Sequence, residues 1–155
     1  MPHRPLPVTI LVADDDADDR QLVAEAFEEA KVLNDLRFVE DGVELLEYLQ
    51  RRGKYVEPAE SPRPGLILLD LNMPRMDGRE ALSRIKGDRN LRAIRVIIMT
   101  TSKAEQDIVN SYDLSASSYI TKPVKFESLV DVVKTISKYW LEIVELPPDE
   151  PDTLA

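Results

Sequence analysis

The sequence predicts a single α/β domain in which a parallel sheet is covered by helices on both faces. Short apolar runs alternate along the chain with segments of helical periodicity, which is typical of strand–helix–strand units. The length of 155 residues suits one domain with one substantial core. Hydrophobic residues make up 43% of the chain and charged residues 32%, a balance that argues against overall disorder. The prediction is therefore a doubly wound sheet of five parallel strands.

Prolines mark the ends of this predicted domain and one loop inside it. They gather within residues 2–7, 58–64 and 147–151, with three prolines in each stretch. Proline lacks a backbone N–H and fits poorly in helices and central strands. The expected organisation is a tail at 1–7, a domain over 8–146 containing one long loop at 53–64, and a second tail at 147–155.

The expected strands are short apolar runs, and three of them are continuous and β-branched or Leu-rich, as strands buried on both faces should be. They cover residues 8–13, 36–39, 66–69, 96–99 and 118–121. A helical segment follows each strand, and right-handed crossovers of this type make successive strands parallel.

The five helical segments share apolar residues three and four positions apart, so each predicts one apolar face. Their apolar positions are Leu22, Val23, Ala26, Phe27 and Ala30; Val43, Leu45, Leu46, Tyr48 and Leu49; Ala81, Leu82 and Ile85; Ala104, Ile108 and Leu114; and Phe126, Leu129, Val133, Ile136 and Trp140, continuing to Ile143 or Val144. We expect Asp16 to cap the first helix, with Asp18 and Asp19 as acids in its first turn. The pair Asp77-Gly78 is interpreted as turn chemistry only.

Charge and composition exclude several classes of function. The formal charge of −9 argues against a nucleic-acid partner, which requires a basic face. The absence of cysteine excludes disulfides, zinc–thiolate sites and thiol catalysis. No apolar run approaches the roughly 18 residues that span a bilayer, and residues 1–7 lack an apolar signal core. We therefore expect a cytoplasmic protein that interacts with neither membrane nor nucleic acid.

Polar residues stand where four of the strands end. Asp14-Asp15-Asp16 follows the first strand and Asp70 the third, while Thr100 and Lys122 follow the fourth and fifth. In a doubly wound sheet the site lies outside the carboxyl ends of the strands, so these side chains are expected to converge. Clustered carboxylates repel one another unless a cation lies between them, and Mg²⁺ accepts such oxygen ligands.

The same set of groups suits phosphoryl transfer. A carboxylate can attack phosphorus to form an aspartyl phosphate, while a metal ion, a lysine and a hydroxyl stabilise the charge on the phosphoryl oxygens. A histidine base is missing from the set, because His3 in the tail is the only histidine.

Four strings of sequence resemble the receiver domain of two-component response regulators, and they occur in order over about residues 8–144. The strings are Val12-Ala13-Asp14-Asp15-Asp16, Leu68 to Gly78, Met99-Thr100-Thr101-Ser102 and Tyr119-Ile120-Thr121-Lys122-Pro123. The resemblance implies a flavodoxin-like fold with strand order 2-1-3-4-5, and it makes residues 8–146 a receiver domain.

The resemblance also implies a role for each residue of the site. Asp70 is then the phosphoacceptor. Asp15, Asp70 and the Asn72 carbonyl bind Mg²⁺ directly, and Asp14 acts largely through water. Thr100 and Lys122 contact the phosphoryl oxygens, and Tyr119 is an aromatic switch that follows Thr100.

A finer resemblance is to the small regulators paired with bacterial phytochromes, which are single receivers without an output domain. It is carried by the loop 53–64, Thr100-Thr101-Ser102, Asp107, Tyr112-Asp113-Leu114, Ser118-Tyr119 and Tyr139-Trp140. The implied partner is a sensor histidine kinase, with a phytochrome as one candidate, and the implied output is through contacts to another protein.

The last helix has a second apolar stripe, formed by Val132, Tyr139 and Ile143. Such a stripe on a surface helix indicates a partner interface, and we expect a homodimer built on the fourth helix, fifth strand and fifth helix. The alternative is a frayed helix end with scattered apolar residues.

The expected function is a phosphorylation switch that is not an enzyme in the ordinary sense, although it catalyses its own phosphoryl transfer and dephosphorylation. Two alternatives remain open. One is a small phosphatase with an aspartyl-phosphate intermediate, which usually has an acid two residues after the nucleophile, where this chain has Asn72. The other is an adaptor that works without phosphorylation.

Overall fold

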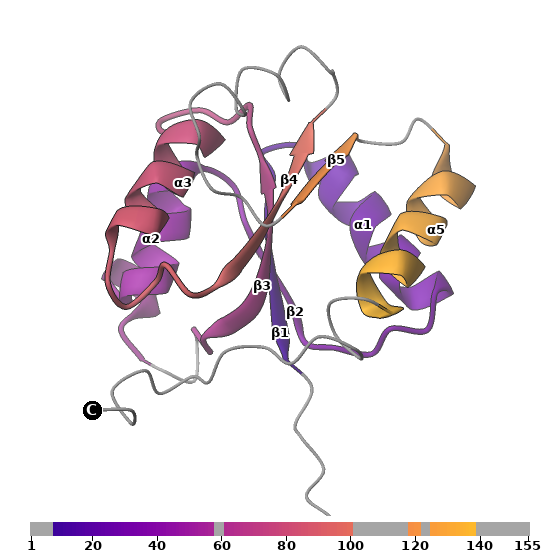
Figure 1. The fold of residues 1–155 in the computed structure, drawn as a ribbon, viewed down its shortest axis with the longest axis horizontal. Coiled ribbons are helices and arrows are strands. Elements are labelled where there is room, and N and C mark those ends of the chain that lie inside the picture. The colour runs from indigo at the N-terminus through magenta and orange to yellow at the C-terminus, as the bar shows by residue number, and fades with distance from the viewer. Residues whose placement is uncertain (1–7, 58–60, 101–117, 122–124, 139–155) are drawn as a thin grey trace, which may run out of the picture.

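The computed structural model describes residues 8–57, 61–100, 118–121 and 125–138. Its centre is a five-stranded parallel sheet with the order β2-β1-β3-β4-β5, which confirms the predicted topology (Figure 1). The strands are β1 (Thr9–Ala13), β2 (Leu36–Val39), β3 (Pro64–Asp70), β4 (Arg95–Thr100) and β5 (Ser118–Thr121). Each lies within two residues of its expected position.

Helices cover both faces of this sheet. They are α1 (Ala17–Glu29), α2 (Gly42–Gln50), α3 (Gly78–Gly87) and α5 (Phe126–Ile136). In Figure 1, α2 and α3 lie on one face of the sheet, and α1 and α5 pack together on the other. The helix expected around residues 104–114 lies outside the described residues, as does the continuation of the last helix to residues 143 or 144.

The core has two halves because alternate residues of each strand point to opposite faces. Leu11, Ile67 and Leu69 belong to the cluster under α2 and α3, whereas Ile10 and Leu68 belong to the cluster under α1 and α5. All five side chains are almost completely buried. Continuous apolar runs in β1 and β3 are therefore explained by burial on both faces.

Aspartates start three of the helices by accepting backbone N–H bonds. Asp16 caps α1 by accepting from the amides of Asp18 and Asp19, as predicted. Asp41 does the same for α2, and Asp77 for α3. Asp77 therefore begins a helix, which corrects its interpretation as part of a turn only.

Two further expectations need correction. Leu22 is 43% exposed because the buried face of α1 is centred on Val23, Ala26 and Phe27, which leaves Leu22 at the edge of the stripe. The stretch 53–64 is not entirely loop. It begins with a short 3-10 helix, Gly53–Tyr55, and ends in β3. Pro64 is the first residue of β3, where its missing N–H interrupts no hydrogen bonds inside the strand.

None of the helices within the described ranges combines the length and apolar character that a membrane span requires.

Candidate metal centre

Three carboxylates from two neighbouring strands meet at the carboxyl edge of the sheet. Asp70 is the last residue of β3, and Asp14 directly follows β1. The two strands are parallel neighbours with Ala13 opposite Leu69, so the next residue of each strand lies at the same edge. Asp14, Asp15 and Asp70 each bring one carboxylate oxygen to within 4.8 Å of the others. The structure thus brings together the three acids that the sequence predicted.

Burial makes this cluster of carboxylates destabilising for the folded protein when no cation is bound. The side chains of Asp14 and Asp70 are buried, with 2% and 7% of each residue exposed, whereas Asp15 is exposed. Like charges in this arrangement repel one another, and burial weakens their screening by water. A hard divalent cation fits a donor set made of carboxylate oxygens with one side open to water.

Backbone hydrogen bonds orient the two buried carboxylates. The amide of Asp16 donates to Asp14 Oδ1 over 3.0 Å, and the amide of Asn72 donates to Asp70 Oδ1 over 3.2 Å. Arg20 in α1 donates from Nη1 to the backbone carbonyl of Asp14 over 2.8 Å. Asp14 and Asp70 are therefore held by the turns that follow their own strands, which keeps their oxygens facing the cluster.

Gly78 allows α3 to begin against the end of β3. Its amide donates to the Leu71 carbonyl over 2.9 Å. A Cβ atom at this position would overlap the Asp70 carbonyl oxygen and lie 2.8 Å from Leu71 Cα. No side chain fits there, so Gly78 sets the position of Asp70 through backbone packing. This role is not visible in the sequence because the neighbouring atoms lie across a loop.

An ion pair that the sequence did not predict ties the loop after Asp70 to the start of α2. Arg75, in the left-handed region with φ 65°, donates from Nε to Asp41 Oδ2 over 2.8 Å and from Nη2 to Asp41 Oδ1 over 3.1 Å. Gly42 reinforces the link by donating from its amide to the Met76 carbonyl over 3.0 Å.

The Arg75 pair also sets the charge of Asp41. Burial acts to raise the pKa of Asp41, but the bonds from Arg75 and from the Glu44 amide outweigh it and hold the pKa below its usual value. The same bond raises the pKa of Arg75. Asp41 therefore stays ionised, caps α2 and anchors the loop that carries Asn72.

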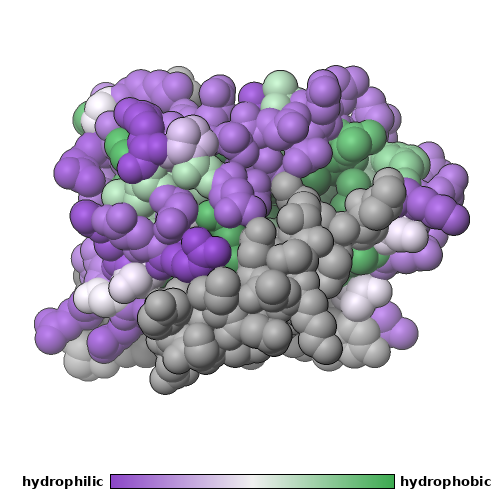
Figure 2. Space-filling view, turned by 90° about the horizontal axis from the view of Figure 1, so that it is seen from above, coloured by the Kyte–Doolittle hydropathy of each residue, from purple (hydrophilic) through white to green (hydrophobic). Residues whose placement is uncertain are grey.

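Figure 2 shows the face of the molecule at the carboxyl ends of the strands. Hydrophilic residues make up most of its described surface. The broadest apolar area lies on the side of α1 and α5, and smaller apolar areas lie on the side of α2 and α3. The large apolar residues exposed on α1 and α5 are Leu22 and Phe126.

Residues 10–134 match the sequence profile of the response regulator receiver domain family. The chain belongs to this family. The receiver is 40% identical over 141 residues to response regulator Rcp1 of Synechocystis sp., a match that covers 91% of this chain and 94% of Rcp1.

Solved structures similar to this receiver include regulators of phytochrome systems. The phosphorylated cyanobacterial phytochrome response regulator RcpA superposes with a TM-score of 0.81 at 41% identity, over 92% of this chain and 99% of RcpA. The Mn²⁺-bound form of Rcp1 superposes with a TM-score of 0.79 at 40% identity, over 92% of this chain and all of the Rcp1 chain. Response regulator RPA3017, of red light signaling in R. palustris, superposes with a TM-score of 0.85 at 34% identity, over 92% of this chain and 99% of RPA3017. The receiver is thus related to phytochrome response regulators.

The remaining predicted site residues of this receiver are described only in part. Thr100 ends β4, and its backbone pairs with that of Thr121 at the end of β5. Tyr119 lies in β5 opposite Ile98. Lys122 lies outside the described residues. Asn72 is exposed beside the acid cluster.

The predicted dimer stripe on the last helix is also described only in part. Val132 is half-buried and packs against the core cluster under α1 and α5, so it lies at the edge of the core face. Tyr139 and Ile143 lie outside the described residues.

Proposed function

We propose that this receiver accepts a phosphoryl group on Asp70 from a sensor histidine kinase of the phytochrome type and signals through contacts with another protein. The observation that carries the proposal is the cluster of Asp14, Asp15 and Asp70, in which carboxylate oxygens from three residues lie within 4.8 Å of one another. Two of the three are buried, so the cluster calls for a cation.

Mg²⁺ is the proposed cofactor, held by Asp15, Asp70 and the Asn72 carbonyl, with Asp14 acting largely through water. When bound, the ion neutralises charge on the phosphoryl oxygens. The Mn²⁺-bound form of the related Rcp1 supports a divalent ion at such a site. Asn72 belongs to the loop that Arg75 and Gly78 hold in place, which gives its carbonyl a fixed position.

The proposed transfer is an in-line displacement. An oxygen of Asp70 forms a bond to phosphorus while the bond from phosphorus to the imidazole nitrogen of the kinase breaks, and that nitrogen keeps the electron pair. Thr100 and Lys122 are the proposed contacts to the phosphoryl oxygens. The similarity to the phosphorylated RcpA and to the red-light regulator RPA3017 supports phosphorylation within a light-signalling pathway.

The proposed output is a shift between two conformations. The acyl phosphate has a charge of about −1.5 to −2 where a carboxylate had −1. Thr100 moves toward this charge, Tyr119 fills the vacated space, and the surface of the fourth helix, β5 and α5 changes. We propose that this surface forms a homodimer in a cytoplasmic protein. Sedimentation with and without beryllofluoride tests the dimer, and a monomer under both conditions would contradict it.

The residue two positions after Asp70 favours a switch over an enzyme that turns over small substrates. Asn72 stands at the site where a phosphatase of this mechanism has an acid, and an amide does not ionise near neutral pH and so cannot act as a general acid or base. Hydrolysis of small phosphate esters with turnover would contradict this part of the proposal.

The direct test is phosphoryl incorporation measured by intact mass. The protein is incubated with acetyl phosphate and Mg²⁺, in parallel with Asp70→Asn, with Asp77→Asn as a control and with an EDTA arm. We expect one added phosphoryl group in the wild type and in the control, and none in Asp70→Asn or in EDTA. Addition of a phosphoryl group to both the wild type and Asp70→Asn, or to neither protein, would contradict the assignment of Asp70 as the phosphoacceptor.

A further inference from the structure

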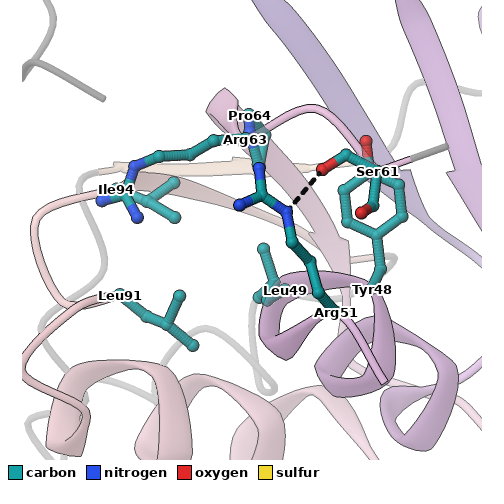
Figure 3. Close-up of a pocket in the computed structure, with 8 residues that line it drawn as sticks. All are labelled: Tyr48, Leu49, Arg51, Ser61, Arg63, Pro64, Leu91 and Ile94. Carbon is teal, nitrogen blue, oxygen red and sulfur yellow. Dashed lines mark hydrogen bonds between the residues drawn. The ribbon is translucent and has the colours of Figure 1, made fainter. Parts of the chain in front are cut away.

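A pocket, drawn in Figure 3, is lined by residues at the amino end of β3, at the opposite edge of the sheet from the acid cluster. It has a volume of about 180 Å³ and lies between the end of α2, the start of β3 and the segment before β4. Its lining residues are Tyr48, Leu49, Arg51, Ser61, Arg63, Pro64, Leu91 and Ile94. Pro64 begins β3 and Asp70 ends it, so a rise of about 3.3 Å per residue places the two sites about 20 Å apart.

The walls of the pocket are fixed by buried groups. Tyr48, Ser61 and Ile94 are each at most 2% exposed. The Tyr48 hydroxyl donates to the Pro62 carbonyl over 2.8 Å, and the Ser61 hydroxyl donates to the Tyr55 carbonyl over 3.0 Å. Burial raises the pKa of Tyr48 to about 12, so its phenol stays neutral. The pocket is therefore preformed, and none of the described side chains that line it has a negative charge.

Two guanidinium groups provide the positive charge of the pocket. Figure 3 shows the Arg51 guanidinium over the pocket, with its Nε donating to the Ser61 carbonyl over 3.3 Å, and the Arg63 guanidinium beside Ile94. Among the described residues, Arg51 makes no ion pair, so the Nη atoms of its guanidinium remain available to a ligand.

The backbone of Arg51 has a conformation that glycine usually adopts. Arg51 ends α2 in the left-handed conformation, with φ 54° and ψ 54°. Glycine is the usual residue at such a position, and another L-residue costs roughly 1 kcal/mol there. The chain accepts this strain and places a guanidinium over the pocket, which motivates a functional interpretation.

The segments that border the pocket also have an excess of positive charge. The two segments that border the pocket, residues 51–64 and 86–95, contain eight Lys and Arg against three Asp and Glu, a formal charge of +5 within a protein of −9. Lys86 donates to the carbonyls of Arg92 and Ile94, in the segment that lines the pocket. Burial, and to a smaller extent the charge of Arg95, lowers the pKa of Lys86.

We propose that this pocket binds a small phosphate monoester, with Arg51 and Arg63 as its ligands. A phosphate dianion matches the two guanidinium charges, and its oxygens match their paired N–H donors. Pockets for drug-sized ligands measure roughly 300–1,000 Å³, so a cavity of about 180 Å³ suits a phosphate with only a few further atoms.

The test measures binding of inorganic phosphate and of glycerol 3-phosphate by calorimetry, with acetate as a singly charged comparison. All variants are made in the Asp70→Asn background and kept in EDTA, so that the acid cluster contributes nothing and the result is independent of the proposed function. Arg51→Gly suits the left-handed backbone and should leave the melting temperature equal or higher. Arg63→Gln removes the second guanidinium, and Arg52→Gln is the matched control, because Arg52 is the exposed neighbour outside the pocket lining.

We expect saturable binding of both phosphate probes, weakened by about tenfold or more in Arg51→Gly and in Arg63→Gln and changed less than about twofold in Arg52→Gln. Acetate should bind more weakly than phosphate. The proposal is overturned if phosphate does not saturate below about 10 mM, if Arg52→Gln loses as much affinity as Arg51→Gly, or if acetate binds as tightly as phosphate.

Discussion

The Asp70→Asn variant, studied without a divalent ion, measures the repulsion inside the acid cluster. Asp14 and Asp70 are both buried, and the nearest carboxylate oxygens of the cluster lie within 4.8 Å. At this distance two unit charges repel by about 3.5 kcal/mol with an effective dielectric constant near 20, and by about 1 kcal/mol in bulk water. Asp14 and Asp70 each take part in a further interaction, so we expect the net effect of the substitution to be smaller than this repulsion.

We therefore expect the free energy of unfolding of Asp70→Asn to exceed that of the wild type by about 1–2 kcal/mol in EDTA. The amide oxygen of the new side chain still accepts the bond from the Asn72 backbone, so little else is lost. For a chain of this size the gain corresponds to a rise in melting temperature of about 2–8 °C.

Thermal unfolding in EDTA and in excess Mg²⁺ is the assay. At one hundred times its dissociation constant, Mg²⁺ should stabilise the wild type by about 2.7 kcal/mol, which reverses the order of the two proteins. Asp77→Asn is the control, since it keeps a good helix cap outside the cluster and should follow the wild type. Repulsion in the cluster is refuted if Asp70→Asn is less stable than the wild type in EDTA, and metal binding is refuted if Mg²⁺ leaves the wild type unchanged.

Two further predictions concern the loop after Asp70. Gly78→Ala should lower the free energy of unfolding by about 2–3 kcal/mol or more and abolish the thermal response to Mg²⁺, because its Cβ meets the Asp70 carbonyl. Gly87→Ala, on the same helix with open space around it, should be neutral or slightly stabilising, and equal losses in the two variants would contradict the packing argument. Arg75→Gln should lower the melting temperature near neutral pH, because the ionised Asp41 loses its partner. The lowered pKa of Asp41 means that this stability is present above the unfolded value of about 3.9 and lost as pH falls through the folded value, so the gap to the wild type should close below about pH 4. A gap that persists in acid would show that the guanidinium acts by packing alone.

The fold was predictable because its central strands, β1 and β3, are buried on both faces. Continuous apolar runs such as residues 66–69 are typical of strands in the middle of a parallel sheet, and alternation with helices fixes the parallel direction. The acids at the strand ends followed from the same rule, since the carboxyl ends of β1 and β3 must share one edge. What was predictable thus depended on periodicity and on position along single elements.

The parts that could not be predicted depend on contacts between distant segments. Arg75 and Asp41 are separated by 34 positions, and nothing in the sequence around either residue indicates the pair. Gly78 is followed by ordinary helix, and the nearby backbone of Asp70 and Leu71 makes a side chain impossible. The short helix Gly53–Tyr55 has too few residues for a periodic signal, and it is held by Tyr55 donating to Glu44.

Crystallography of the protein with Mg²⁺ and beryllofluoride is the decisive experiment for the proposed phosphorylation site. We expect one metal ion coordinated by Asp15, Asp70 and the Asn72 carbonyl at about 2.0–2.1 Å, with the beryllofluoride group on an oxygen of Asp70. Metal bound elsewhere, or beryllofluoride on a different carboxylate, would show that the acid cluster is not the site of phosphoryl transfer.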